Sequence, residues 1–265
     1  MYGKFKQSGC ERLMKKLKHL YVNFIMTFSC KLNCTYCTIP LELRRNVEFL
    51  GNDKIKLSLF QAVKFFKDND YDLLTISITG DELENIPNFL ERLQEILAYM
   101  DKTLVGIPAE KVQLKMHTNL NAKEDFYLEQ FDMLEDAKRF CRPEFETVYQ
   151  AMYHKPKREG KLNFIREQTS RIGIDYLSSI GLRNEDDRSA VKHLYSNLVF
   201  NFDDMPKTKK LTDREMLYII VATDSGITNG CGFEMSDNLF KLQDRDFCST
   251  CPHETCVMLD DLNKL

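Results

Sequence analysis

The sequence lacks any apolar run long enough to cross a membrane. Its longest runs, such as residues 73–78, are interrupted by Thr75 and Ser77, whereas a membrane helix needs about 20 apolar residues. The N-terminal region has no stretch that combines a basic start, an apolar run and a small-residue cleavage site. We therefore expect a soluble cytoplasmic protein that has no membrane partner.

The chain also lacks a large excess of charge of either sign. Its 37 Lys and Arg residues nearly balance 40 Asp and Glu residues, for a formal net charge of −3. This balance gives no general attraction to nucleic acid or anionic lipid, and we expect no nucleic-acid partner. The basic run at residues 154–158 is typical of a solvated loop, with binding of nucleotide phosphates as the alternative.

Segments with strand character alternate with segments of helical spacing, and there is no internal repeat. Strands are predicted at residues 19–28, 73–79, 112–118, 171–177 and 198–202, and a sixth is expected within 122–160. Helices are predicted at 57–68, 87–100, 186–196 and 212–221. This alternation predicts an α/β fold with a parallel sheet and helices packed outside it.

Seven of the nine cysteines fall into two clusters. In a reducing compartment they are not expected to form disulfides, and clustering is what metal ligation requires. Cys30, Cys34 and Cys37 form a C-x3-C-x2-C triplet directly after the first predicted strand, where α/β folds place reactive groups. Three thiolates can hold three irons of a cubane cluster and leave the fourth iron open. Zinc is the alternative, but it would need a fourth Cys or His, and none lies within the loop.

The triplet, with Tyr36 just before its last cysteine, resembles the radical S-adenosylmethionine superfamily. The resemblance implies that Cys30, Cys34 and Cys37 bind a [4Fe-4S] cluster whose open iron is chelated by S-adenosylmethionine. It places Tyr36 near the adenine. It covers about residues 19–222 in element order, and it implies a partial (β/α)6 TIM-like barrel.

A second motif, Gly80-Asp81-Glu82, follows the second predicted strand. It resembles the family's Gly-Gly-Glu, which receives the amino group of S-adenosylmethionine. Asp81 replaces the middle glycine, so the backbone can approach the ligand differently there, while Glu82 keeps the acceptor. Thr118-Asn119 at the end of the third strand also matches many members of the family.

A second cysteine group, in the tail, comprises Cys231, Cys248, Cys251 and Cys256. Four thiolates can saturate one iron–sulfur cluster or one structural zinc, and His253 could replace one cysteine as a ligand. The group resembles the auxiliary-cluster extensions of the family called SPASM and twitch, which implies one auxiliary [4Fe-4S] cluster that assists electron transfer. The expected organisation is an N-terminal extension (1–18), the barrel core (19–225) and a cysteine-rich extension (226–265).

The resemblance implies an enzyme that cleaves S-adenosylmethionine reductively to a 5′-deoxyadenosyl radical. That radical would take a hydrogen atom from a peptide or small-molecule substrate, and a flavodoxin or ferredoxin would donate the electron. Oxidoreductase, maturase and isomerase activities all stay open. The alternatives are oxidation or rearrangement of a nucleoside or modified base, and a non-catalytic iron–sulfur or zinc protein on the same fold.

No single residue is selected as catalytic. Cys10 and Cys141 are lone cysteines, and a lone cysteine is more often a small packed side chain than a reactive one. His117 ends the third predicted strand, so it is either functional or a strand-end histidine bonded to the backbone.

Overall fold

The computed structural model describes residues 17–30, 44–45, 48–80, 83–118, 120–150, 156–181, 214–222 and 227–229. Over these residues strands and helices alternate, as the sequence predicts. The elements are β1 (Leu17–Ile25), α2 (Asn52–Asp68), β2 (Leu73–Thr79), η1 (Leu83–Asn85), α3 (Phe89–Thr103), η2 (Ala109–Lys111), β3 (Val112–Thr118), α4 (Glu124–Ala137), β4 (Arg142–Gln150), α5 (Pro156–Ile172), β5 (Asp175–Gly181), β6 (Arg214–Val221) and β7 (Ile227–Asn229).

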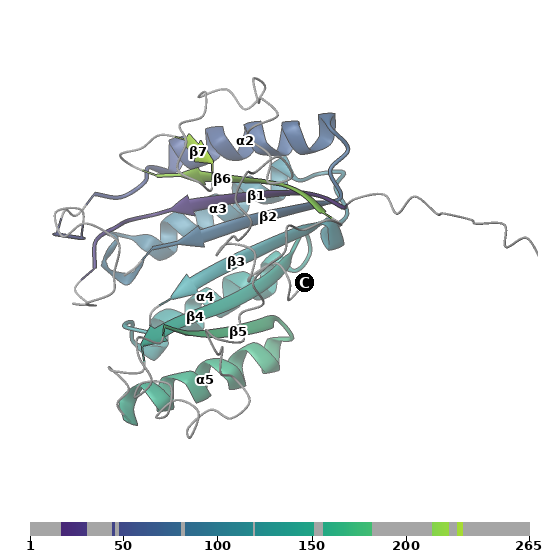
Figure 1. Ribbon diagram of the computed structural model, residues 1–265. Helices are drawn as coiled ribbons and strands as arrows, with labels where there is room; N and C mark the ends of the chain where they lie inside the picture. The colour runs from purple at the N-terminus through teal and green to yellow at the C-terminus, as the bar shows by residue number, and fades with distance from the viewer. Residues whose placement is uncertain are drawn as a thin grey trace, which may run out of the picture.

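The strands form one seven-stranded sheet in the order β5-β4-β3-β2-β1-β6-β7 (Figure 1). All neighbouring pairs are parallel except β6 and β7, which are antiparallel. Strands β1 to β5 follow chain order, as in a β/α barrel, but β6 pairs with β1. The expected parallel sheet is confirmed, and the loop that follows β1 leaves the sheet between two parallel neighbours.

The hydrophobic core lies between the sheet and the helices. Alternate residues of each strand point toward this core, so Leu20, Val22 and Phe24 of β1 are buried there. The helices α2, α3, α4 and α5 cover this face of the sheet (Figure 1). Most of the buried apolar side chains of α2 recur every three or four residues, which is the spacing of one helix face. The buried apolar residues are Ile55, Leu59, Ala62, Val63, Phe65 and Phe66.

The segment 212–221 was predicted to be a helix, and this prediction is wrong. Residues Arg214–Val221 form β6, which runs parallel to β1. Its residues Leu217, Ile219 and Val221 are buried and pair with the core-facing residues of β1. A short apolar run fits either a buried strand or a buried helix, and here the pairing with β1 decides between them.

The strand predicted at 171–177 begins later than expected. Helix α5 continues to Ile172, and Gly173 follows it at a positive φ of 64°, which is the usual way for a glycine to end a helix. The strand β5 then starts at Asp175. The strand expected within 122–160 is confirmed as β4, whereas the predicted helix 186–196 and strand 198–202 lie outside the described residues.

The described helices include none that is both long and apolar enough to span a membrane. The basic run at 154–158 was expected to be a loop, but its residues 156–158 form the start of α5, while residues 154 and 155 lie outside the described residues.

Helix α2 offers a matched pair of leucines that tests the core. Leu59 is fully buried, whereas Leu57 is 60% exposed on the same helix. We expect Leu59→Ala to lower the free energy of unfolding by about 3 kcal/mol, because it removes buried methyl groups and leaves a cavity. Leu57→Ala should change it by less than about 0.5 kcal/mol. Urea unfolding followed by circular dichroism measures both, and equal losses would contradict this packing.

Candidate functional site

The carboxyl ends of β1 and β2 meet at one edge of the sheet. Ile25 pairs with Thr79, and just beyond them the backbone N–H of Met26 donates to the carbonyl oxygen of Thr79 at 2.7 Å. Gly80 follows directly. Because parallel α/β sheets bind ligands beyond their carboxyl ends, this edge is the candidate functional site.

The loop that carries the first cysteine group is tied together at its base. The backbone N–H of Cys30 donates to the carbonyl oxygen of Arg44 at 3.0 Å, and that of Leu50 donates to Met26 at 2.8 Å. The Thr27 hydroxyl donates to the carbonyl oxygen of Glu48 at 2.8 Å. These bonds hold Cys30, which is half-buried, beside the end of β1. Cys34, Tyr36 and Cys37 lie outside the described residues.

Gly80, the first residue of the second motif, packs against the segment that leads to Cys30. A Cβ atom at Gly80 would lie 2.7 Å from Leu83 Cδ2 and 3.4 Å from Thr27 Cγ2. A side chain at Gly80 would make Leu83 shift, and it would be in van der Waals contact with Thr27, so Gly80 lies directly against the segment that leads to Cys30. The structure therefore brings Gly80 next to the approach to the cysteine loop, while Asp81 and Glu82 lie outside the described residues.

The donor set at this edge fits an iron–sulfur cluster in its chemistry. Three cysteines of one short loop supply thiolates, which are the ligands that such clusters use. The Cys30–Arg44 bond joins the two residues that flank the segment carrying Cys34 and Cys37, and Cys30 itself follows closely after β1. Within the described residues, no group of three His, Cys, Asp or Glu side chains could hold a metal ion.

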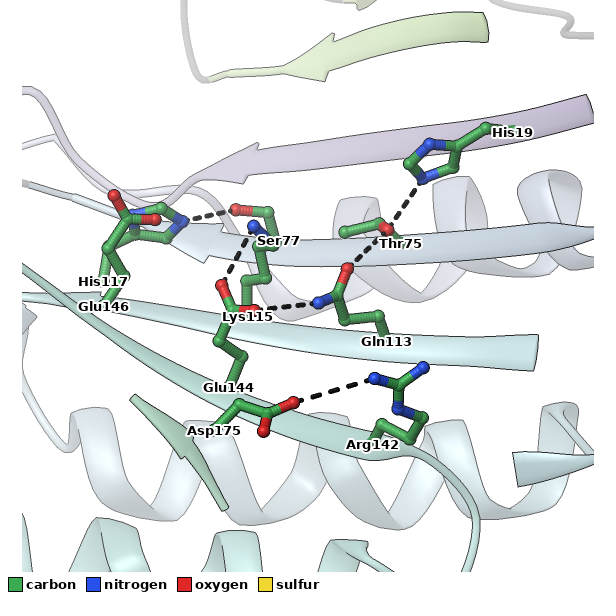
Figure 2. Close-up of polar contacts among 10 residues, drawn as sticks. All are labelled: His19, Thr75, Ser77, Gln113, Lys115, His117, Arg142, Glu144, Glu146 and Asp175. Atoms are coloured by element: carbon green, nitrogen blue, oxygen red, sulfur yellow. Dashed lines mark hydrogen bonds and ion pairs between the residues drawn. The ribbon is translucent and has the colours of Figure 1, made fainter. Parts of the chain in front are cut away.

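The sheet face that points away from the helices is polar across β2, β3 and β4. We call these residues the inner wall: Thr75, Ser77, Thr79, Gln113, Lys115, His117, Glu144 and Glu146. Figure 2 shows most of them in one continuous array. The sequence analysis did not identify this wall, although the alternation of polar and apolar residues in β3 and β4 is visible in the sequence.

The half of the wall nearest the amino ends of the strands is a chain of hydrogen bonds. Thr75 Oγ1 donates its single hydrogen to Gln113 Oε1 at 3.1 Å. It therefore has to be the acceptor in its hydrogen bond with His19 Nε2, at 2.8 Å. Gln113 Nε2 donates to Glu144 Oε2 at 2.9 Å. The chain ends on an ion pair between Lys115 Nζ and Glu144 Oε1 at 2.9 Å, with the lysine 1% exposed (Figure 2). Burying this polar array is tolerable because its members satisfy one another.

The half nearest the carboxyl ends is built around His117. Its Nε2 lies 3.0 Å from Ser77 Oγ, and its Nδ1 lies 3.3 Å from Glu146 Oε2 (Figure 2). Burial, assisted by the nearby Lys115 cation, lowers the pKa of His117 to about 3, so the imidazole is neutral at pH 7. A neutral ring that donates from Nδ1 to Glu146 and accepts at Nε2 from Ser77 fits these distances. His117 is thus held by side chains from the neighbouring strands.

Of the remaining cysteines, the structure describes Cys141. Cys141 is buried, and its thiol donates to the carbonyl oxygen of Ala137 at 3.3 Å. Burial raises the pKa of Cys141 to about 12, so it is a packed, unreactive thiol as the sequence suggested. Cys10 and the second cysteine group, Cys231, Cys248, Cys251 and Cys256, lie outside the described residues.

Comparison with known proteins finds distant similarity to solved structures and no match of any other kind. No family model and no curated protein matches the chain. Among solved structures it is similar to HydG, a maturase of the [FeFe]-hydrogenase, with 12% identity and a TM-score of 0.40 over 69% of this chain and 40% of HydG. It is also similar to Streptococcus suis SuiB bound to S-adenosylmethionine, with 12% identity and a TM-score of 0.24 over 80% of this chain and 58% of SuiB.

The chain therefore spans less than two thirds of either structure. Neither likeness is close enough to assign a function, which has to come from the residues of this chain.

The lowered pKa of His117 predicts an acid-dependent loss of stability. In the unfolded chain a histidine titrates near 6.5, so between pH 6.5 and about 3 the unfolded state binds a proton that the folded state does not. The contribution of His117 is complete above pH 6.5 and is lost as the pH falls, by up to about 1.4 kcal/mol per pH unit. His117→Gln should flatten this part of the profile. Urea unfolding at pH 7 and pH 5 measures it, and parallel profiles for both proteins would contradict the assignment.

Proposed function

We propose that the chain is a radical S-adenosylmethionine enzyme. Cys30, Cys34 and Cys37 hold a [4Fe-4S] cluster with one open iron, and S-adenosylmethionine binds there. The observation that carries the proposal is the C-x3-C-x2-C triplet directly after β1, at the carboxyl edge of a parallel sheet. When bound, this pair of groups supplies a 5′-deoxyadenosyl radical that removes a hydrogen atom from a peptide or small-molecule substrate.

The residues around the triplet support this function. The bond between Cys30 and Arg44 joins the residues on either side of the segment that carries Cys34 and Cys37, and it holds Cys30 close after β1. Gly80, the start of the second motif, lies against Thr27 in the segment that leads to Cys30. We propose that Glu82 accepts the amino group of S-adenosylmethionine, that Gly80 and Asp81 contribute backbone, and that Tyr36 lies against the adenine.

We further propose that Cys231, Cys248, Cys251 and Cys256 bind one auxiliary [4Fe-4S] cluster that assists electron transfer. Four closely spaced thiolates support this assignment, since they can ligate a cluster completely. A flavodoxin or ferredoxin would supply the electron. In the sheet, β7 ends at Asn229, two residues before Cys231, and β6 lies between β7 and β1.

Removing one ligand of the first cluster tests the activity. Cys34→Ala should abolish formation of 5′-deoxyadenosine, because the site loses a thiolate that holds the cluster. The assay is anaerobic, with reconstituted protein, S-adenosylmethionine and dithionite, and the product is quantified by chromatography. Cys141→Ala is the matched control, since this thiol is packed elsewhere, and it should stay active. Formation of 5′-deoxyadenosine by Cys34→Ala at the wild-type rate would refute the proposal.

Iron content tests the second cysteine group separately. The wild-type protein should bind about eight irons, and the Cys248→Ala/Cys251→Ala double variant about four. Iron is counted after anaerobic reconstitution, and zinc is measured in the same samples. A wild-type protein that holds about four irons together with one zinc would show a structural zinc in the tail instead.

A further inference from the structure

The inner wall is unusual for the inside of a β/α sheet. Such positions are commonly filled by branched apolar side chains that pack as a core. Here the inward positions Thr75, Ser77 and Thr79 of β2 face polar or charged residues on β3, and these face two glutamates on β4. Burying polar groups costs free energy unless each is hydrogen-bonded, so a wall made solely of them calls for a reason beyond packing.

Exposure rises at the carboxyl ends of β2 and β3, while Ser77 and the two glutamates of β4 stay buried. Toward the amino ends, Thr75, Gln113 and Lys115 are at most 2% exposed, and their polar atoms bond to one another or to Glu144. Toward the carboxyl ends, Thr79 and His117 are half-buried. The wall is thus closed at the end away from the cysteine loop and open at the end beside it.

The open end carries polar side chains from three neighbouring strands. Asn23 of β1 is half-buried beside Thr79, whose hydroxyl donates to Asn23 Oδ1 at 3.0 Å. Ile78 pairs with Met116, so Thr79 and His117 lie one residue further along on adjacent strands. Ser77 and Glu146 hold the His117 ring in place. A hydroxyl, an amide and a neutral imidazole are therefore presented together. The Thr79 oxygen can accept a further hydrogen bond, and His117 Nε2 can exchange its bond with Ser77 for one with a ligand.

We propose that this inner wall binds a small molecule rich in hydroxyl or amine groups, and that Asn23, Thr79 and His117 contact it. The identification of this molecule as the substrate rests on the proposed function. A polar wall replaces the water shell of such a ligand, whereas an apolar side chain of a peptide would leave the donors and acceptors unpaired. Sites built to bond a hydroxyl reject analogues without it far more strongly than apolar pockets reject extra groups.

Binding of simple ring compounds to the full-length, anaerobically purified protein tests the proposal. The measurement does not depend on the iron content of the protein. The probes are myo-inositol and glucosamine, which carry many hydroxyl or amine groups, and cyclohexanol, which has a six-membered ring with one hydroxyl. Saturation-transfer difference NMR titrations measure the three affinities. We expect myo-inositol or glucosamine to bind at least about tenfold more tightly than cyclohexanol, equivalent to one or more extra hydrogen bonds.

Two variants locate the binding site on the wall. Thr79→Val keeps the shape of the side chain but removes the hydroxyl, and it should weaken binding of the better polar probe by about tenfold. His117→Phe should weaken it at least as much. Thr103→Val is the matched control, because the Thr103 hydroxyl bonds to the carbonyl oxygen of Tyr99 within α3, away from the wall. It should leave the affinity unchanged.

The outcomes separate this proposal from the proposed function. It is overturned if neither polar probe binds, if cyclohexanol binds equally well, or if both wall variants bind like the wild type. It is also overturned if S-adenosylhomocysteine displaces the polar probe, since the wall would then serve the cofactor. Formation of 5′-deoxyadenosine by iron-loaded protein is scored independently. If no 5′-deoxyadenosine forms, the enzyme assignment is wrong, but the ligand preference of the wall is unaffected.

Discussion

The parallel alignment of β1 with both of its neighbours is the constraint on which the rest of the structure depends. Parallel pairing brings the ends of β1 and β2 to one edge, so Met26 can bond to Thr79 and the cysteine loop begins beside Gly80. It also puts residues of equal register on the same face of the sheet. The helices bury one face, and the polar residues of β2, β3 and β4 accumulate on the other.

The two ends of the inner wall have different roles: the buried, paired end stabilises the sheet, and the end with His117 is the one proposed to bind a ligand. Lys115 and Glu144 are buried as a pair, and breaking such a pair would leave a charge without compensation. Their hydrogen bonds extend through Gln113 and Thr75 to His19, so the side chains at this end of the wall hold one another in place. His117 stands two residues further along β3, and the Lys115 cation helps to keep its imidazole neutral. Burial is the larger cause of the lowered His117 pKa, and the buried Lys115 adds to it.

The strands with the clearest patterns could be predicted from the sequence, and the ambiguous ones could not. Residues 73–79 and 112–118 were predicted with the bounds that β2 and β3 have, because turn residues and helical segments flank them. The helix prediction for 212–221 failed because its apolar residues fit a helix and a strand equally well. The strand with which it pairs, β1, lies about two hundred residues away in the chain. Gly173 ends α5 through a backbone conformation that spacing rules do not reveal.

The sequence by itself determined the chemistry that is available: three closely spaced thiolates, a glycine motif after the second strand, and an α/β alternation. These are local features, and local spacing is enough to find them. Only the tertiary structure decided that β6 lies beside β1, that Gly80 packs against the approach to Cys30, and that Ser77, His117 and Glu146 meet. Those contacts join residues far apart in the chain, and they exist because strand pairing, rather than sequence proximity, sets which side chains share a face.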